Sequence, residues 1–120
     1  MHIITNNPKV ADAYCDIACF QGGSVSDVFT AVRDAIHKGA RLISHPLSGS
    51  VKPNESPYKS VIVSTNRGDL DFQHLRMIED AIATLKKLQV KHRVIDNATQ
   101  QDFQIIDLDL INCAMIPFHV

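Results

Sequence analysis

Several features are scarce or missing in this 120-residue sequence, and each absence excludes a class of protein. No apolar run reaches the roughly 18 residues that a membrane-spanning helix needs. The 12 basic and 13 acidic side chains leave a formal charge of −1, so no strongly basic face is expected for nucleic acid or for a membrane. The three cysteines are too few and too irregularly spaced for a disulfide framework.

The first residues also lack the basic region and the long apolar stretch of a secretory signal peptide. Together with the low cysteine content, this absence predicts a cytoplasmic protein with reduced thiols. Apolar residues make up 45% of the chain and charged residues 21%, which is ordinary for a globular protein. We therefore expect residues 1–120 to form a single domain.

Short apolar and β-branched segments predict the strands. Four of them are bounded by polar or turn-forming residues, as buried strands usually are. They are His2–Thr5, Ile17–Phe20, Leu42–Ser44 and Val61–Val63. A fifth segment, Val90–Val94, alternates between apolar and charged residues and predicts an edge strand.

Helical signals lie between these strands. Asn7 followed by Pro8 is a favourable cap and first helical residue, which predicts a helix up to Tyr14. Ser24 and Asp27 have the spacing of a capping box, and the helix they begin carries an apolar stripe that should end at Gly39. Residues 72–88 carry another apolar stripe, with lysines in the last turn.

The C-terminal part of the sequence is ambiguous. A capping box at Thr99 and Asp102 predicts a helix, and an apolar stripe with helical spacing supports it: Phe103, Ile106, Leu110 and Cys113. Residues 106–110 also alternate as a strand would. A strand over 103–106 therefore stays open beside a helix that covers at least 108–115.

Strands that alternate with helices are typical of a parallel sheet covered on both faces. The predicted fold class is α/β, a small three-layer αβα (Rossmann-like) domain with a mostly parallel sheet of about 4–5 strands. The direction of the strand at 61–63 stays open. A hairpin-like loop before it would make that strand antiparallel.

Polar residues follow three of the predicted strands, at the edge where ligands collect in such sheets. Free backbone N–H groups at helix starts, hydroxyls, an imidazole and an ammonium together suit a phosphate or a carboxylate. The candidate ligand-binding residues are Asn6, Asn7, Ser24, His45, Ser48, Gly49, Ser50 and Lys52. No nucleotide-binding glycine motif and no metal-ligand spacing occurs, so no cofactor and no metal are expected.

Each of these signals also has an ordinary structural interpretation. The Gly22–Ser24 segment can be a turn and a helix cap, and His45 can be a hydrogen-bonded structural residue. The cysteines can be small buried apolar side chains. Asp107 and Asp109 can belong to a solvated face. The five other histidines show no common ligand spacing.

Three segments resemble the GrdX family: His2–Pro8, His45–Ser60 and Phe103–Ile111. The His-Pro-Leu-x-Gly-Ser-x-Lys-Pro pattern in the second segment is the most specific part, and the resemblance extends over nearly the whole chain. Members are small proteins whose genes accompany the selenium-dependent glycine, sarcosine and betaine reductase system. The resemblance therefore implies an accessory or uncharacterised cytoplasmic protein, and it supplies no catalytic residues that could be transferred to this sequence.

Three functions follow from these observations. The first is binding of a small anionic ligand by the strand ends and the His45–Lys52 loop. The second is an interaction or assembly factor of a reductase system, in which the proline-bearing loop contacts a protein partner. The third is an enzyme that uses His45 as an acid or base. The apolar C-terminal residues 114–120 also predict a homo-oligomer if they do not pack on their own domain.

Overall fold

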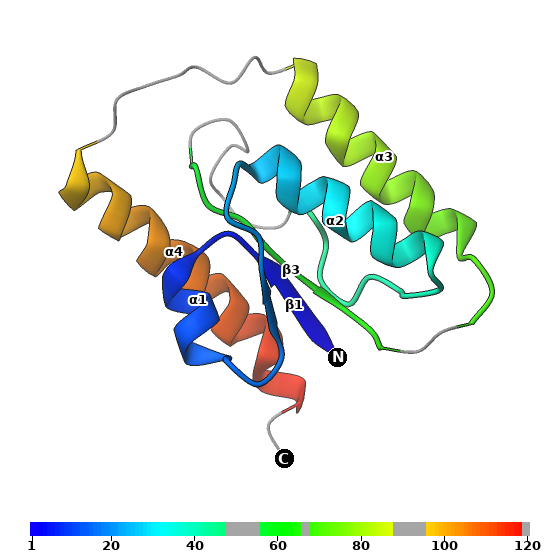
Figure 1. Cartoon of the computed structure of the whole chain (residues 1–120), viewed down its shortest axis with the longest axis horizontal. Coiled ribbons are helices and arrows are strands. Elements are labelled where there is room, and N and C mark those ends of the chain that lie inside the picture. The colour runs from blue at the N-terminus through cyan, green and yellow to red at the C-terminus, as the bar shows by residue number, and fades with distance from the viewer. Residues whose placement is uncertain (48–55, 66–67, 88–95, 119–120) are drawn as a thin grey trace.

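The computed structural model describes residues 1–47, 56–65, 68–87 and 96–118. Its central sheet has three strands in the order β2-β1-β3, formed by Ala18–Phe20, His2–Thr5 and Ser60–Val63 (Figure 1). Strands β1 and β2 are parallel, with Ile3 opposite Ala18. Strands β1 and β3 are antiparallel, with Thr5 opposite Ser60. The carboxyl ends of β1 and β2 therefore lie beside the amino end of β3.

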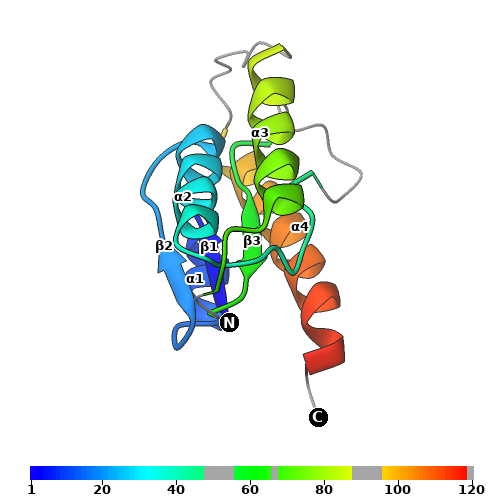
Figure 2. The same ribbon diagram turned by 90° about the vertical axis from the view of Figure 1, so that its right-hand side faces the viewer.

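Helices cover both faces of this sheet (Figures 1 and 2). Helices α2 (Val25–His37) and α3 (Phe72–Lys87) pack on one face, and α1 (Pro8–Ala13) and α4 (Asn97–Met115) pack on the other. A short 3₁₀ helix, η1 (Ile116–Phe118), follows α4. Within the described ranges, no helix is long and apolar enough to span a bilayer.

The alternation of side chains along the strands separates the core into two parts. Ile4, Val61 and Val63 contact the apolar faces of α2 and α3, where Phe29 is fully buried. Ile3 and Ile62 contact the other face, where α1 and α4 contribute Val10, Ile111 and Met115. Strands β1 and β3 are therefore each buried on both faces of the sheet.

The predicted 4–5-stranded, mostly parallel Rossmann-like sheet is wrong, although the chain is α/β. The sheet is mixed, with one parallel and one antiparallel pair. The chain reaches β3 from α2 through residues 38–59, and the described parts of that connection contain no helix. A parallel connection needs a crossover, usually helical, so a connection without one favours the antiparallel direction.

The predicted strand at 42–44 forms a single bridge, from Leu42 to Val63. The amides of Ile43 and Ser44 both donate to the carbonyl of Ile62, at 2.9 and 3.2 Å. The Ser44 hydroxyl in turn accepts from the Ile62 amide at 2.8 Å, in the place of a backbone carbonyl. This side-chain substitution interrupts the ladder. The predicted edge strand at 90–94 lies outside the described residues.

The ambiguous C-terminal region is helical from Asn97 to Met115, so no strand forms at 103–106. Asp96 caps this helix by accepting from the Thr99 amide at 2.7 Å, which places the start before the predicted capping box. The buried face is also different from the predicted apolar stripe. It consists of Gln104, Asp107, Ile111 and Met115.

Gly39 ends α2 in the predicted way. Its φ of 99° lies in the left-handed region, its amide donates to the Ile36 carbonyl, and the Ala40 amide donates to the Ala35 carbonyl at 3.0 Å. These two bonds form a Schellman motif. A Cβ at this φ is strained, so Gly39→Ala should lower the free energy of unfolding by about 1–2 kcal/mol in urea denaturation.

Gly68→Ala is the matched control, because a Cβ there would meet no atom within 4 Å and the φ is not left-handed. We expect little change in its unfolding free energy. An equal decrease in unfolding free energy in the two variants would show that the left-handed conformation of Gly39 is not the cause of the destabilisation.

Candidate functional site

Buried polar residues gather where β1 and β2 end and β3 begins. They come from β1 and the residues after it, from the start of β3, and from α4. We call this group the polar cluster: Thr5, Asn6, Asn7, Ser60, Gln104 and Asp107, each at most 8% exposed. Buried polar groups are costly unless they are hydrogen-bonded, so their partners determine what the cluster does.

A ring of hydrogen bonds converges on the Asp107 carboxylate. The Ser60 hydroxyl donates to Asp107 Oδ2 at 2.6 Å and lies 2.6 Å from the Thr5 hydroxyl. Because Ser60 uses its proton on Asp107, the Thr5 hydroxyl donates to Ser60. Asn7 completes the ring with two donors. Its backbone N–H donates to Thr5 Oγ1 at 2.9 Å, and its side-chain Nδ2 donates to Asp107 Oδ2 at 3.0 Å. The ring ties β1, β3 and α4 together.

Asn6 joins three segments that are distant in sequence. Its Nδ2 donates to the carbonyls of Gly23 and Pro57, at 2.9 and 2.8 Å. Its Oδ1 accepts from the Lys59 amide at 2.9 Å. The side chain therefore holds the end of the 45–58 loop against the residues that follow β2. We call this arrangement the Asn6 latch.

Two further predicted site residues act as helix caps. Asn7 Oδ1 accepts from the Lys9 amide at 3.0 Å and begins α1. Ser24 begins α2 with the predicted capping box, in which Asp27 Oδ2 accepts from the Ser24 amide at 3.0 Å. The Asp27 carboxylate thus already occupies the end of α2 that a ligand anion would otherwise use.

His45 lies at the described start of the long loop and is exposed. Its Nδ1 accepts from the Leu47 amide at 3.0 Å, so this ring nitrogen stabilises a local turn. The predicted ligand residues Ser48, Gly49, Ser50 and Lys52 lie outside the described residues. The structure therefore brings together Asn6, Asn7 and the residues before Ser24, and it leaves the His45 side chain exposed.

Lys59 directly precedes Ser60 of this cluster, and its ammonium is attracted by the Asp107 carboxylate. Burial lowers the pKa of Lys59 below its ordinary value of 10.5, and the attraction of Asp107 opposes that change without cancelling it. The cost of removing the ammonium from water is thus larger than the stabilisation that it gains from the Asp107 carboxylate. A second negative charge at this position would favour the charged form.

This pKa predicts a pH dependence. With a folded pKa below 10.5, the unfolded chain binds more protons just below 10.5, so stability rises with pH through that window. We therefore expect the stability of the natural protein, relative to a Lys59→Gln variant, to increase as the pH rises toward 10.5 in urea denaturation. Groups common to both proteins cancel in this difference. A difference that falls with pH would contradict the assignment.

Sequence reasoning missed several residues of the site. Lys59 and Ser60 fall within the His45–Ser60 segment that resembles the family, but they are not among the predicted site residues. The same holds for Tyr58, whose hydroxyl accepts from Gln104 Nε2 at 2.9 Å. Asp107 was assigned to a solvated face, which is wrong because it is 6% exposed. One signal could have found it: Gln104, Asp107, Ile111 and Met115 share one helical face.

The metal and cysteine interpretations can also be compared with the structure. Among the described residues, no group of three or more metal-ligating side chains comes together. All three cysteines are free and exposed, so their interpretation as buried apolar side chains is wrong.

A family model described as GrdX-like protein matches residues 2–116. The match includes all the helices and strands described above except the end of η1. It confirms the resemblance drawn from the strand-end, loop and C-terminal segments. No curated protein and no solved structure matches the chain.

Proposed function

The chain belongs to the GrdX-like family, and from the geometry of its strand ends we propose that it binds a small anionic ligand there. Lys59 supplies the positive charge in this proposal. The sequence-predicted loop residues Ser48, Gly49, Ser50 and Lys52, together with His45, supply further hydrogen-bond donors. Phosphate and carboxylate groups are the chemical classes that such donors suit.

The position of Lys59 is the observation that carries this proposal, because the Asn6 side chain holds its backbone at the edge where β1 and β2 end. The lowered pKa of Lys59 means that desolvation exceeds the attraction of Asp107. An anion in contact with the ammonium would restore part of the lost solvation, and binding and protonation of Lys59 would then favour each other. Lysines whose pKa is lowered by burial beside a charged partner are found at functional sites more often than on ordinary surfaces.

The Asn6 latch gives the site a fixed frame. It holds Pro57 and Lys59 beside Gly23, at the edge where α/β sheets bind ligands. Asn6, Asn7 and Ser24 spend their side-chain groups on internal bonds, so their role in the proposal is to position the loop. The contacts to the ligand fall to Lys59 and to the loop residues.

Calorimetric titration with inorganic phosphate tests the proposal. We expect saturable binding to the natural protein, a loss of at least about tenfold in affinity for Lys59→Gln, and a smaller loss for Lys52→Gln. Lys86→Gln, on the exposed side of α3, is the matched control and should bind as the natural protein does. Equal affinity in the Lys59 and Lys86 variants, or no binding of phosphate to any of them, would refute the proposal.

A second function has its own supporting observation. Helix α4 and η1 carry exposed isoleucines: Ile105, Ile106 and Ile116 are 47%, 41% and 63% exposed. Apolar side chains grouped on one helix favour a protein interaction, in line with an accessory factor of a reductase system or with a homo-oligomer. Light scattering of the natural protein and of Ile106→Asp separates these cases: a mass that falls to one chain in the variant supports the oligomer.

A further inference from the structure

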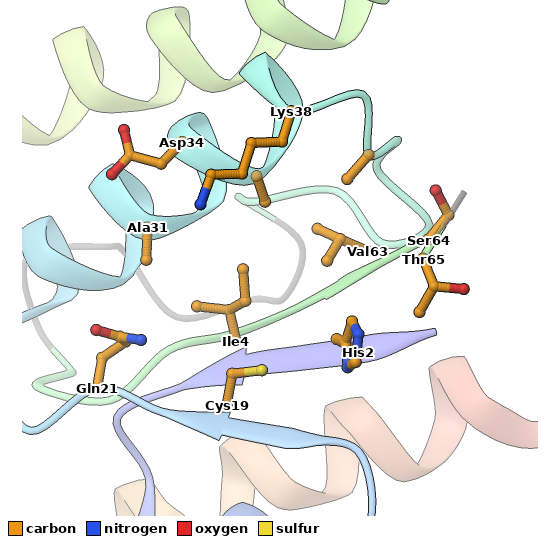
Figure 3. Close-up of a pocket in the computed structure, with 12 residues that line it drawn as sticks. His2, Ile4, Cys19, Gln21, Ala31, Asp34, Lys38, Val63, Ser64 and Thr65 are labelled. Carbon is orange, nitrogen blue, oxygen red and sulfur yellow. The ribbon is translucent and has the colours of Figure 1, made fainter. Parts of the chain in front are cut away.

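A second site lies on the other face of the sheet, between α2 and the uncovered side of β2 (Figure 3). It is a cavity of about 470 Å³, within the usual size range of small-molecule pockets. Ile4 and Cys19 lie on its sheet side, and Ala31 and Ala35 lie on its helix side. Neither Lys59 nor any residue of the polar cluster lines this cavity, so the two sites have no described residue in common.

The hollow results from small side chains on one side of α2. The large apolar residues of this helix, such as Phe29 and Ile36, are fully buried in the core against β1, β3 and α3. Ala31 and Ala35 are one turn apart and partly exposed, and they leave the space above β2 unfilled. Two apolar side chains, Ile4 and Val63, line the sheet side of the cavity, and they are 5% and 2% exposed.

A lysine also lines this cavity. Figure 3 shows the Lys38 side chain bending back from the end of α2, with its ammonium on the side of the helix nearer the sheet. The Asp34 carboxylate, which also lines the cavity, points along the helix. Within the described residues Lys38 forms no ion pair. The side chains of Ser64, Thr65 and His2 add polar groups at one end.

We propose that this cavity binds a small organic carboxylate with an apolar body. The carboxylate pairs with Lys38, and the apolar body covers Ile4, Val63 and the two alanines. A cation in a cavity with apolar side chains is the arrangement that selects such a molecule over both an inorganic anion and a neutral apolar compound. The inference does not depend on the phosphate site at Lys59.

Cys19 provides a built-in reporter of occupancy. It is opposite Ile4 in the parallel register, so both side chains are on the same face, and Figure 3 shows its sulfur directed at the cavity. Cys15 and Cys113 are also free and exposed, but they do not line the cavity. A ligand in the cavity should therefore shield Cys19 alone from an alkylating reagent.

The test measures iodoacetamide labelling of each cysteine by peptide mass spectrometry, with fragmentation to separate Cys15 from Cys19. Benzoate at ten times its dissociation constant should slow Cys19 labelling by about tenfold and leave the other two rates unchanged. Benzamide, which has the same ring without the charge, should protect much less. Lys38→Gln should remove the advantage of benzoate over benzamide, and phosphate should give no protection.

A filled-cavity variant tests the same inference in another way. Ala35→Leu places a larger side chain in the hollow and should abolish protection by benzoate, whereas Ala83→Leu, on the exposed side of α3, should not. Because Lys38 is exposed, its variant should fold even if Ala35→Leu does not. Unchanged Cys19 labelling in saturating benzoate, equal slowing of all three cysteines, or full protection in Lys38→Gln would overturn the proposal.

Discussion

Replacing Asp107 by alanine is expected to lower the free energy of unfolding by about 3–5 kcal/mol, since two hydrogen bonds to a buried carboxylate are lost. The Ser60 hydroxyl and the Asn7 side-chain amide both donate to Asp107 Oδ2. In the variant these two buried donors lose that acceptor, which adds their desolvation to the loss. Urea denaturation followed by circular dichroism measures the change.

Two variants serve as controls for this prediction. Asp109→Ala removes an exposed carboxylate two residues further along α4, and its unfolding free energy should stay within about 0.5 kcal/mol of the natural protein. Asp107→Asn keeps one oxygen that can accept from both donors, so it should be less harmful than alanine. If the alanine variants at 107 and 109 were equally stable, the hydrogen-bond ring would not hold α4 on the sheet.

Replacing Asn6 by alanine is the second change with a large expected effect. Three hydrogen bonds disappear, and the carbonyls of Gly23 and Pro57 lose their partner, so we expect a loss of about 2–4 kcal/mol in unfolding free energy. The Lys59 amide also loses its acceptor. Its hydrogen exchange should therefore accelerate more than that of amides in the middle of β3.

The Asn6 variant should also bind phosphate more weakly, because Lys59 and the end of the loop are no longer fixed. Asn97→Ala, at the exposed start of α4, is the matched control and should change neither stability nor binding appreciably. An Asn6→Ala protein that loses stability but binds phosphate with full affinity would show that the latch does not position the site.

Local signals predicted the parts of the fold that depend on local chemistry. The caps at Asn7 and Ser24 are confirmed, as is the end of α2 at Gly39, because each involves residues a few positions apart. The direction of β3 was not predictable, because it depends on the path of a long connection. The loss of the strand at Leu42–Ser44 depends on one bond from the Ile62 amide, 18 residues away.

In the candidate site too, features that depend on neighbouring residues were predictable, and contacts between distant residues were not. Asn6 and Asn7 were predicted because they are polar residues that directly follow a predicted strand. Their hydrogen-bond partners, however, are distant in the sequence. The Lys59 amide is 53 residues from Asn6, and Asp107 is 100 residues from Asn7. Helix α4 was read from its apolar stripe, whereas its buried face includes Gln104 and Asp107. A polar residue that is buried by a tertiary hydrogen bond looks the same in the sequence as one that faces water.

The most direct test of the anion site is a crystal structure with selenate, a tetrahedral anion whose selenium can be located by anomalous scattering. We predict a selenium peak with an oxygen within hydrogen-bond distance of Lys59 Nζ in the natural protein, and no such peak in crystals of Lys59→Gln. Selenate in both crystals at the same position, or ordered Lys59 side chains without any selenate beside them, would contradict the proposed function.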